Sequence, residues 1–227
     1  MDWCEENPEE CYNINVQGTR NVCEAAQSVG ALLVYPSTCY IYSGEKIGPY
    51  DERVDKVIPE KIVGVYYKSK WEAENAVREV CGENYIITRL GALFGGGKQD
   101  KKFVGKIVEK VRSGIKEIPA VNDRAIQPSS IKDTVRNLLK LIEAKGRGVF
   151  NMVGHGSATY YDYARAIVEF LGVDGVQVIP ISSSAFAESA PRAKNLTALN
   201  GRLQEMKIDF MRDWKIALKE YIYESFR

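Results

Sequence analysis

Two short apolar runs, each preceded by a helical pattern, constrain the fold of this chain more than any other feature. The runs are Ala31–Tyr35 and Tyr85–Arg89, and neither shows the strict polar–apolar alternation of a strand with one face in solvent. The residues before them, 7–29 and 66–80, have apolar positions at helical spacing. Helix, strand, helix, strand in this order predicts a parallel α/β sheet whose strands are buried on both faces.

Individual residues mark where these elements begin and end. Asn7 can cap the first helix, Pro8 suits its first turn, and Gly30 is expected to end it. Pro36 is expected to close the first strand. Beyond residue 95 the pattern predicts helices at 102–113, 131–144, 160–171 and 213–226, and strands at 148–152 and 176–179.

Composition excludes several classes of protein. The formal charge of +1 over 227 residues gives no positive field of the kind that nucleic-acid binders carry. No apolar stretch approaches the roughly 18 residues of a membrane span, and the first residues are acidic, so we expect a cytoplasmic protein without a membrane partner. Five cysteines without a Cys-x-x-Cys pair, and a single histidine, His155, predict neither a disulfide framework nor a metal site.

The residues best suited to catalysis are Tyr66 and Lys70, which lie four positions apart on a predicted helix. This spacing puts both side chains on one helix face, where the ammonium is expected to lower the pKa of the phenol toward neutrality. Tyr42 and Lys46 have the same spacing but enclose a Ser-Gly loop. Ser37 and Thr38 follow the first buried strand, the position at which open α/β sheets place their active sites.

Several ordered motifs resemble those of the extended short-chain dehydrogenases, and within them the dTDP-4-dehydrorhamnose reductases. The motifs are the stretch Tyr35–Gly44, the acidic turn Gly48–Glu52, the Tyr66–Lys70 pair and the strand end Arg89–Gly95. Later matches include Gln127-Pro128, Asp133, Ala164–Ala166 and Pro191–Asn195. The resemblance covers almost the whole chain, from Asn15 to the last helix.

This resemblance implies roles for particular residues. Thr38 would polarise a sugar C4 carbonyl, Tyr66 would donate the proton, and Lys70 would hold the nicotinamide ribose of NADP or NAD. Tyr66 and Asn15 would also contact the cofactor, while Ser37 and Arg192 would contact a nucleotide-sugar substrate. The resemblance further allows a homodimer.

Two positions depart from the reductase pattern. The aspartate that follows Ser-Thr in that branch is replaced by Cys39, which removes a carboxylate expected to support the catalytic hydroxyls. Tyr67 stands where the branch has glycine, and its ring is expected to narrow the mouth of the site.

A third departure concerns the cofactor. The Gly-x-x-Gly-x-x-Gly turn that holds a pyrophosphate at a helix N-terminus does not occur in this sequence. The fold class we predict is therefore an incomplete Rossmann-like doubly wound parallel sheet with a smaller mixed α/β domain. Residues 1–95 would form the C-terminal part of the NAD(P)-binding domain, with later segments returning to it, and residues 96–227 would mainly bind substrate.

The leading hypothesis is the NAD(P)H-dependent reduction of a nucleotide-linked 4-keto sugar. A nucleotide-sugar epimerase or dehydratase would use the same Thr, Tyr and Lys. A relative of another class, the non-catalytic regulatory subunit of a methionine adenosyltransferase, has the same type of fold. The missing glycine turn and Cys39 favour this last reading, whereas the intact Thr38, Tyr66 and Lys70 oppose it.

The absent turn generates a prediction about affinity. We expect the 227-residue chain to bind NADH or NADPH far more weakly than an extended chain, meaning the same residues preceded by a nucleotide-binding segment that contains the turn, and to lack reductase activity. Titration calorimetry with both cofactors measures this. Micromolar binding to the 227-residue chain would contradict the prediction.

Overall fold

A three-stranded parallel sheet organises one of the two parts of the protein. The computed structural model describes residues 1–185 and 190–227. The strands lie in the order β1 (Leu33–Thr38), β3 (Tyr85–Leu90) and β8 (Gly148–Met152), so that β3 is central. Leu33 pairs with Tyr85, and Ile86 pairs with Gly148, which sets the register. The parallel α/β sheet predicted from the sequence is confirmed.

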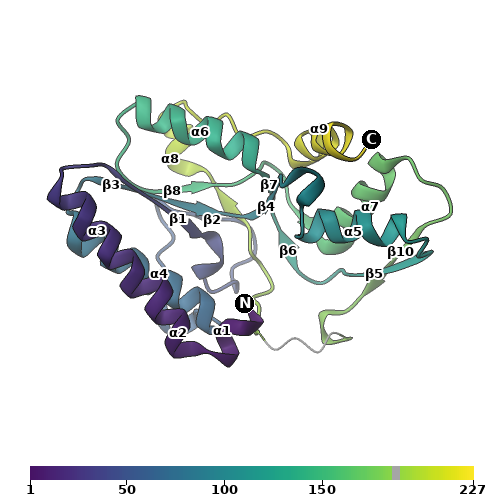
Figure 1. Ribbon diagram of the computed structural model, residues 1–227, viewed down its shortest axis with the longest axis horizontal. Coiled ribbons are helices and arrows are strands. Elements are labelled where there is room, and N and C mark those ends of the chain that lie inside the picture. Colours follow the sequence, from purple (N-terminus) through teal and green to yellow (C-terminus); the bar gives the residue numbers. More distant parts are fainter. Residues whose placement is uncertain (186–189) are drawn as a thin grey trace.

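Helices cover both faces of this sheet (Figure 1). Helices α3 (Gly18–Ser28) and α4 (Val65–Cys81) lie on one face, and α6 (Ile131–Glu143) and α8 (Gly201–Glu205) lie on the other. Side chains alternate accordingly, because Ile87 packs in the α3–α4 cluster while its neighbour Ile86 packs with Leu141 of α6. The doubly wound arrangement is therefore built from residues buried on both sides of the strands.

The helical region at the N-terminus is more divided than expected. It comprises α1 (Asp2–Glu6), α2 (Pro8–Tyr12), a π-helical turn over Asn13–Gln17, and α3. Asn7 stands at the N-cap of α2 and Pro8 at its first position, as predicted, but the Asn7 side chain donates to the Trp3 carbonyl instead of capping α2. Helix α3 ends at Ser28, and Gly30 has a left-handed φ of 66°.

The other part of the protein packs around its own apolar cluster. Helices α5 (Phe103–Arg112), α7 (Tyr160–Leu171) and α9 (Trp214–Phe226) and the parallel pair β5 (Glu117–Val121) and β10 (Gln177–Ile181) contribute to this cluster. Ile118, Phe94 and Ile167 are among its fully buried side chains. Figure 1 shows this part beside the three-stranded sheet.

Short strand pairs connect the two parts. They are β4 (Ala92–Phe94) with β7 (Pro128–Ser130), β6 (Ala125–Ile126) with β9 (Ala158–Thr159), and β2 (Tyr50–Asp51) with β11 (Ala198–Leu199). The sequence analysis missed these strands because two or three residues show no periodicity. No helix in residues 1–185 and 190–227 is long and apolar enough to cross a bilayer.

The expected end of the first strand was wrong. Strand β1 continues through Pro36 to Thr38. Among the described strands β1 is an edge, and an edge strand tolerates proline because only one side of its backbone pairs with a neighbour. Thr38 is therefore the last residue of the strand and lies at its carboxyl end.

A buried ion pair joins α4 to the central strand. Glu74 of α4 is fully buried and accepts two hydrogen bonds from the Arg89 guanidinium of β3, at 3.0 and 2.8 Å. Arg78 reaches the same carboxylate at 2.6 Å. The third contact of Arg89 is to the Tyr42 hydroxyl, at 2.9 Å. The two arginines hold the pKa of Glu74 below its usual value despite its burial.

We predict that breaking this pair is costly. Glu74→Gln or Arg89→Met should each lower the free energy of unfolding by about 3–5 kcal/mol. Glu74→Gln leaves the buried Arg89 without its counter-charge, and Arg89→Met leaves the buried Glu74 with only the partly exposed Arg78. The double variant Glu74→Leu/Arg89→Met should lose less than either single variant. Urea unfolding measures these differences. The exposed pair Arg20–Glu79 is the control, since Glu79→Gln should change stability little.

Single variants as stable as the wild type would show that the pair does not hold α4 on the sheet.

Candidate active site

Thr38 and Ser37 lie at the carboxyl end of β1 but face different surroundings. The Thr38 oxygen accepts the Tyr40 backbone N–H at 3.2 Å and so caps the short 3₁₀ turn Cys39–Ile41. This bond uses the oxygen as an acceptor and leaves the hydroxyl proton of Thr38 for another partner. The Ser37 hydroxyl is buried and lies beside the Glu74 carboxylate, whose pKa it helps to lower.

Lys70 reaches back from α4 to the same end of β1. Its ammonium donates to the Pro36 carbonyl at 2.8 Å and lies 4.0 Å from the centre of the Tyr35 ring. Burial lowers the pKa of Lys70 to about 8, while the Glu74 carboxylate, one helical turn further along α4, opposes this shift. Lys70 is thus a desolvated cation beside the strand that ends in Thr38.

Tyr66 lies one turn before Lys70, in the first turn of α4. Its ring packs edge-to-face on Tyr67 at 5.4 Å between centroids. Burial raises the pKa of the Tyr66 phenol, and the thiols of Cys4 and Cys11 add to the effect. The expectation that Lys70 lowers this pKa was wrong, because the ammonium is directed at Pro36 and Tyr35 while Tyr66 packs against the N-terminal segment.

Asn15 is connected to Tyr66 through a serine. Its amide donates to the Ser69 hydroxyl at 2.9 Å and contacts the Cys11 sulfur at 3.4 Å. Ser69 in turn donates to the backbone carbonyl of Tyr66 at 2.8 Å. The structure therefore places Asn15 behind α4, where it supports the helix, and its predicted contact with a cofactor stays a prediction.

Arg192 is half-buried in a segment that meets the beginning of α4. Gly64, the N-cap of α4, has a φ of 86°, and a Cβ there would lie 3.4 Å from the Pro191 carbonyl oxygen. The next residue of that segment, Ala193, packs against Gly44. The structure thus brings Arg192 into the region of Tyr66, although these residues are 126 positions apart in the sequence.

The two departures from the reductase pattern have structural explanations. Tyr67 is 2% exposed, in a cluster with Ile41 and Ile62, so the prediction that it narrows the mouth was wrong: its ring fills the core behind Tyr66. Cys39 is also buried, and its thiol donates to the Arg89 carbonyl at 3.3 Å. Burial raises the Cys39 pKa, so this thiol is a neutral core residue directed away from Thr38.

Sequence reasoning missed the groups that hold the site in place. Glu74, Arg89 and Tyr42 form the polar network under α4, and Asn151 of β8 extends it by accepting from Tyr42 at 3.4 Å. A signal was present, because a charged residue such as Arg89 inside an apolar strand requires a buried partner. A separate hollow of about 180 Å³, lined by Gly95, Lys132 and Tyr221 among others, lies between the loop after β4 and α9.

The structure places a hydroxyl donor and a half-buried ammonium at the end of one parallel strand, and a phenol that stays protonated at neutral pH one helical turn before that ammonium. Such a set can polarise a carbonyl and deliver a proton to its oxygen. Open α/β sheets bind their ligands at this edge.

Comparisons with known proteins identify the family of this chain. Residues 1–226 match the RmlD substrate binding domain family. A dTDP-4-dehydrorhamnose reductase from Mycobacterium tuberculosis is 31% identical over 224 residues, covering 96% of this chain and 71% of the relative. The crystal structure of a Clostridium acetobutylicum dTDP-4-dehydrorhamnose reductase superimposes with a TM-score of 0.91 at 34% identity, over 99% of this chain and 76% of that one.

A second crystal structure bears on the cofactor. The dTDP-4-dehydrorhamnose reductase of Bacillus anthracis, determined in complex with NADP, has a TM-score of 0.92 at 29% identity, over 99% of this chain and 77% of its own. A UDP-glucose 4-epimerase from Thermotoga maritima is 19% identical with a TM-score of 0.75, which shows a shared fold. The resemblance identified from the motifs is therefore confirmed, and the chain belongs to the RmlD substrate-binding-domain family of dTDP-4-dehydrorhamnose reductases.

Proposed function

We propose that this chain carries the substrate-binding and proton-donating part of an NADP(H)-dependent reductase that acts on a dTDP-linked 4-keto sugar. The observations that support the proposal are that Thr38 ends β1, that Lys70 reaches Pro36 of the same strand, and that Tyr66 lies one turn before Lys70 on α4, in a chain of this family. Relatives named for this reaction match almost the whole length of the chain.

The chain's own residues fit the nicotinamide end of the cofactor. When bound, NADPH supplies the hydride for such a reduction. Lys70 uses one of its three N–H donors on Pro36, so two remain to hold ribose hydroxyls. The fit does not extend to the pyrophosphate, because the sequence has no glycine turn for it.

In the proposed mechanism three side chains act on the substrate carbonyl. Thr38, whose oxygen already accepts from Tyr40, donates its proton as a hydrogen bond to the C4 oxygen and polarises the carbonyl. Tyr66, kept protonated by burial, transfers its phenolic proton to that oxygen as negative charge develops. Arg192 offers a planar guanidinium suited to the diphosphate of the nucleotide.

Two alternatives predict different products. An epimerase or dehydratase would convert the sugar without net oxidation of NADPH. The dehydratase and epimerase structures that are similar to this chain share only its fold. A non-catalytic subunit would bind without turnover. A fall in NADPH absorbance with a dTDP-4-keto-6-deoxy sugar identifies the reductase. Where NADPH is not consumed, analysis of the sugar for a converted product separates an epimerase or dehydratase from a non-catalytic subunit. We also expect a cytoplasmic enzyme and a homodimer, which localisation and light scattering would test.

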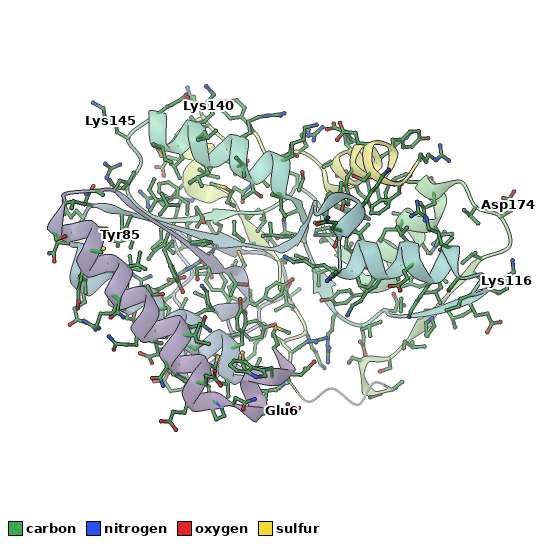
Figure 2. All side chains as sticks on the ribbon, viewed as in Figure 1. Glu6, Tyr85, Lys116, Lys140, Lys145 and Asp174 are labelled. Carbon is green, nitrogen blue, oxygen red and sulfur yellow. The ribbon has the colours of Figure 1, made fainter. Side chains whose placement is uncertain are left out.

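We predict that Tyr66→Phe lowers turnover of the extended chain by about 10²–10⁴-fold, because it removes only the donated proton. The KM for the sugar should change little. Tyr85→Phe is the control, because Tyr85 begins β3 at the opposite end of the sheet (Figure 2). Steady-state kinetics measures both variants. Unchanged turnover in Tyr66→Phe would assign the proton to another group or to water.

The buried ammonium of Lys70 predicts a pH dependence of stability. The unfolded chain keeps this proton up to about pH 10.5, whereas the folded chain loses it near pH 8. Between these values the unfolded state binds more protons, so the contribution of Lys70 to stability rises with pH, by up to about 3 kcal/mol. Below pH 8 the cost of burying the charge is present in full.

Urea unfolding of the wild type and of Lys70→Met between pH 7.5 and 10.5 measures this effect. We expect the stability of the wild type relative to the variant to increase across that range. A constant difference would mean that Lys70 titrates like an exposed lysine.

A further inference from the structure

The beginning of α4 has an unusual cap. A helix leaves its first backbone N–H groups without partners, and a polar side chain at the N-cap normally accepts one of them. The N-cap of α4 is Gly64, which has no side chain. The missing acceptor comes from far away in the sequence, because a carboxylate oxygen of Glu5 accepts the Val65 N–H at 2.6 Å.

The contact joins the N-terminal helix to the residue before Tyr66. Glu5 lies in α1, and its half-buried carboxylate carries a negative charge to the positive end of a 17-residue helix. The preceding residue, Cys4, is buried and close enough to Tyr66 for its thiol to affect the pKa of the phenol. Helix α1 therefore bonds the backbone at the start of α4 and lies near the Tyr66 side chain.

Gly64 is the point at which three segments meet. Its φ of 86° favours glycine, and a Cβ there would lie 3.0 Å from the bonding oxygen of Glu5 and 3.4 Å from the Pro191 carbonyl oxygen. The segment that carries Arg192 thus touches the same residue as Glu5. The position of Tyr66 relative to that segment depends on how this junction is packed.

We infer that Glu5 is a positioning residue for the proposed reaction: by capping α4 from outside, it fixes the first turn of the helix and with it the Tyr66 phenol. The inference rests on the proposed function. Glu5 does not touch the reacting atoms in this role, and it acts through the Val65 backbone. A misplacement of about 1 Å is enough to reduce a rate by roughly 10²-fold.

The contact itself can be tested in the 227-residue chain. A carbonyl or carboxylate oxygen that accepts an amide proton changes the chemical shift of that proton, so the Val65 amide resonance should move in Glu5→Ala, which removes the acceptor. Glu6→Ala is the control, since Glu6 is exposed at the end of α1 (Figure 2). A Val65 amide insensitive to Glu5→Ala would overturn the inference.

The positioning role is tested in the extended chain. Glu5→Ala should lower kcat by roughly 10- to 100-fold with the KM for the sugar little changed. Glu5→Gln keeps an acceptor oxygen at the same reach and should restore most of the activity, while Glu6→Ala should behave as the parent. Gly64→Ala strains the backbone at the same junction and should also lower kcat.

Several outcomes would count against the role. A lower melting temperature with unchanged kcat would make Glu5 only structural. Failure of Glu5→Gln to restore activity would show that the cap is not what matters. An inactive parent extended chain would overturn the proposed function as well, whereas an active parent with an unaffected Glu5→Ala variant overturns the positioning role alone.

Discussion

The ion pair between Glu74 and Arg89 is the interaction on which the candidate site depends. Helix α4 carries Tyr66 and Lys70, and Glu74 connects that helix to the central strand. Because charges buried without partners cost several kcal/mol each, the helix can pack in only those registers that bring the two groups together. The Tyr42 hydroxyl and Asn151 extend the same network to the loop after β1 and to β8. Apolar contacts between α4 and the sheet would hold the helix but would tolerate small shifts along its axis.

The edge strand β1 supplies the other half of the site. Pro36 lacks a backbone N–H, and its carbonyl accepts from Lys70 rather than serving only the sheet. Strand β1 therefore receives the Lys70 side chain of α4 at the position of Pro36. Thr38, two residues later, is placed by the same strand and by its own bond to Tyr40. The position of the lysine and of the hydroxyl relative to each other is set mainly by backbone geometry.

Elements with strong periodicity could be predicted from the sequence. Features that depend on contacts between residues far apart in the sequence could not. Helix 160–171 and strand 148–152 were predicted to the residue, since each has a clear apolar pattern. The π-helical turn at Asn13–Gln17 was not predictable from a period of 3.6 residues. Cys11 and Cys23 are both fully buried, yet twelve residues of regular α-helix would leave them about 120° apart. The wider turn takes up residues, so that the Cys11 thiol contacts Ser69 of α4 while Cys23 packs in the cluster that includes Ile87 of the central strand. The partners of Glu5, Asn15 and Lys70 could not be predicted either, because each partner lies on a different element from the residue that it contacts.

One carboxylate also links the stability of the site to its chemistry. Glu74 is the charge that opposes the effect of burial on Lys70, and it is simultaneously held by Arg89 and Arg78. Its attraction for the Lys70 ammonium is therefore shared with two guanidinium groups, which is why burial still dominates and the pKa of Lys70 falls to about 8. A stronger counter-charge would keep Lys70 fully protonated but would also hold the ammonium more tightly. A half-buried lysine beside a carboxylate that is partly neutralised by two arginines keeps its charge near neutral pH.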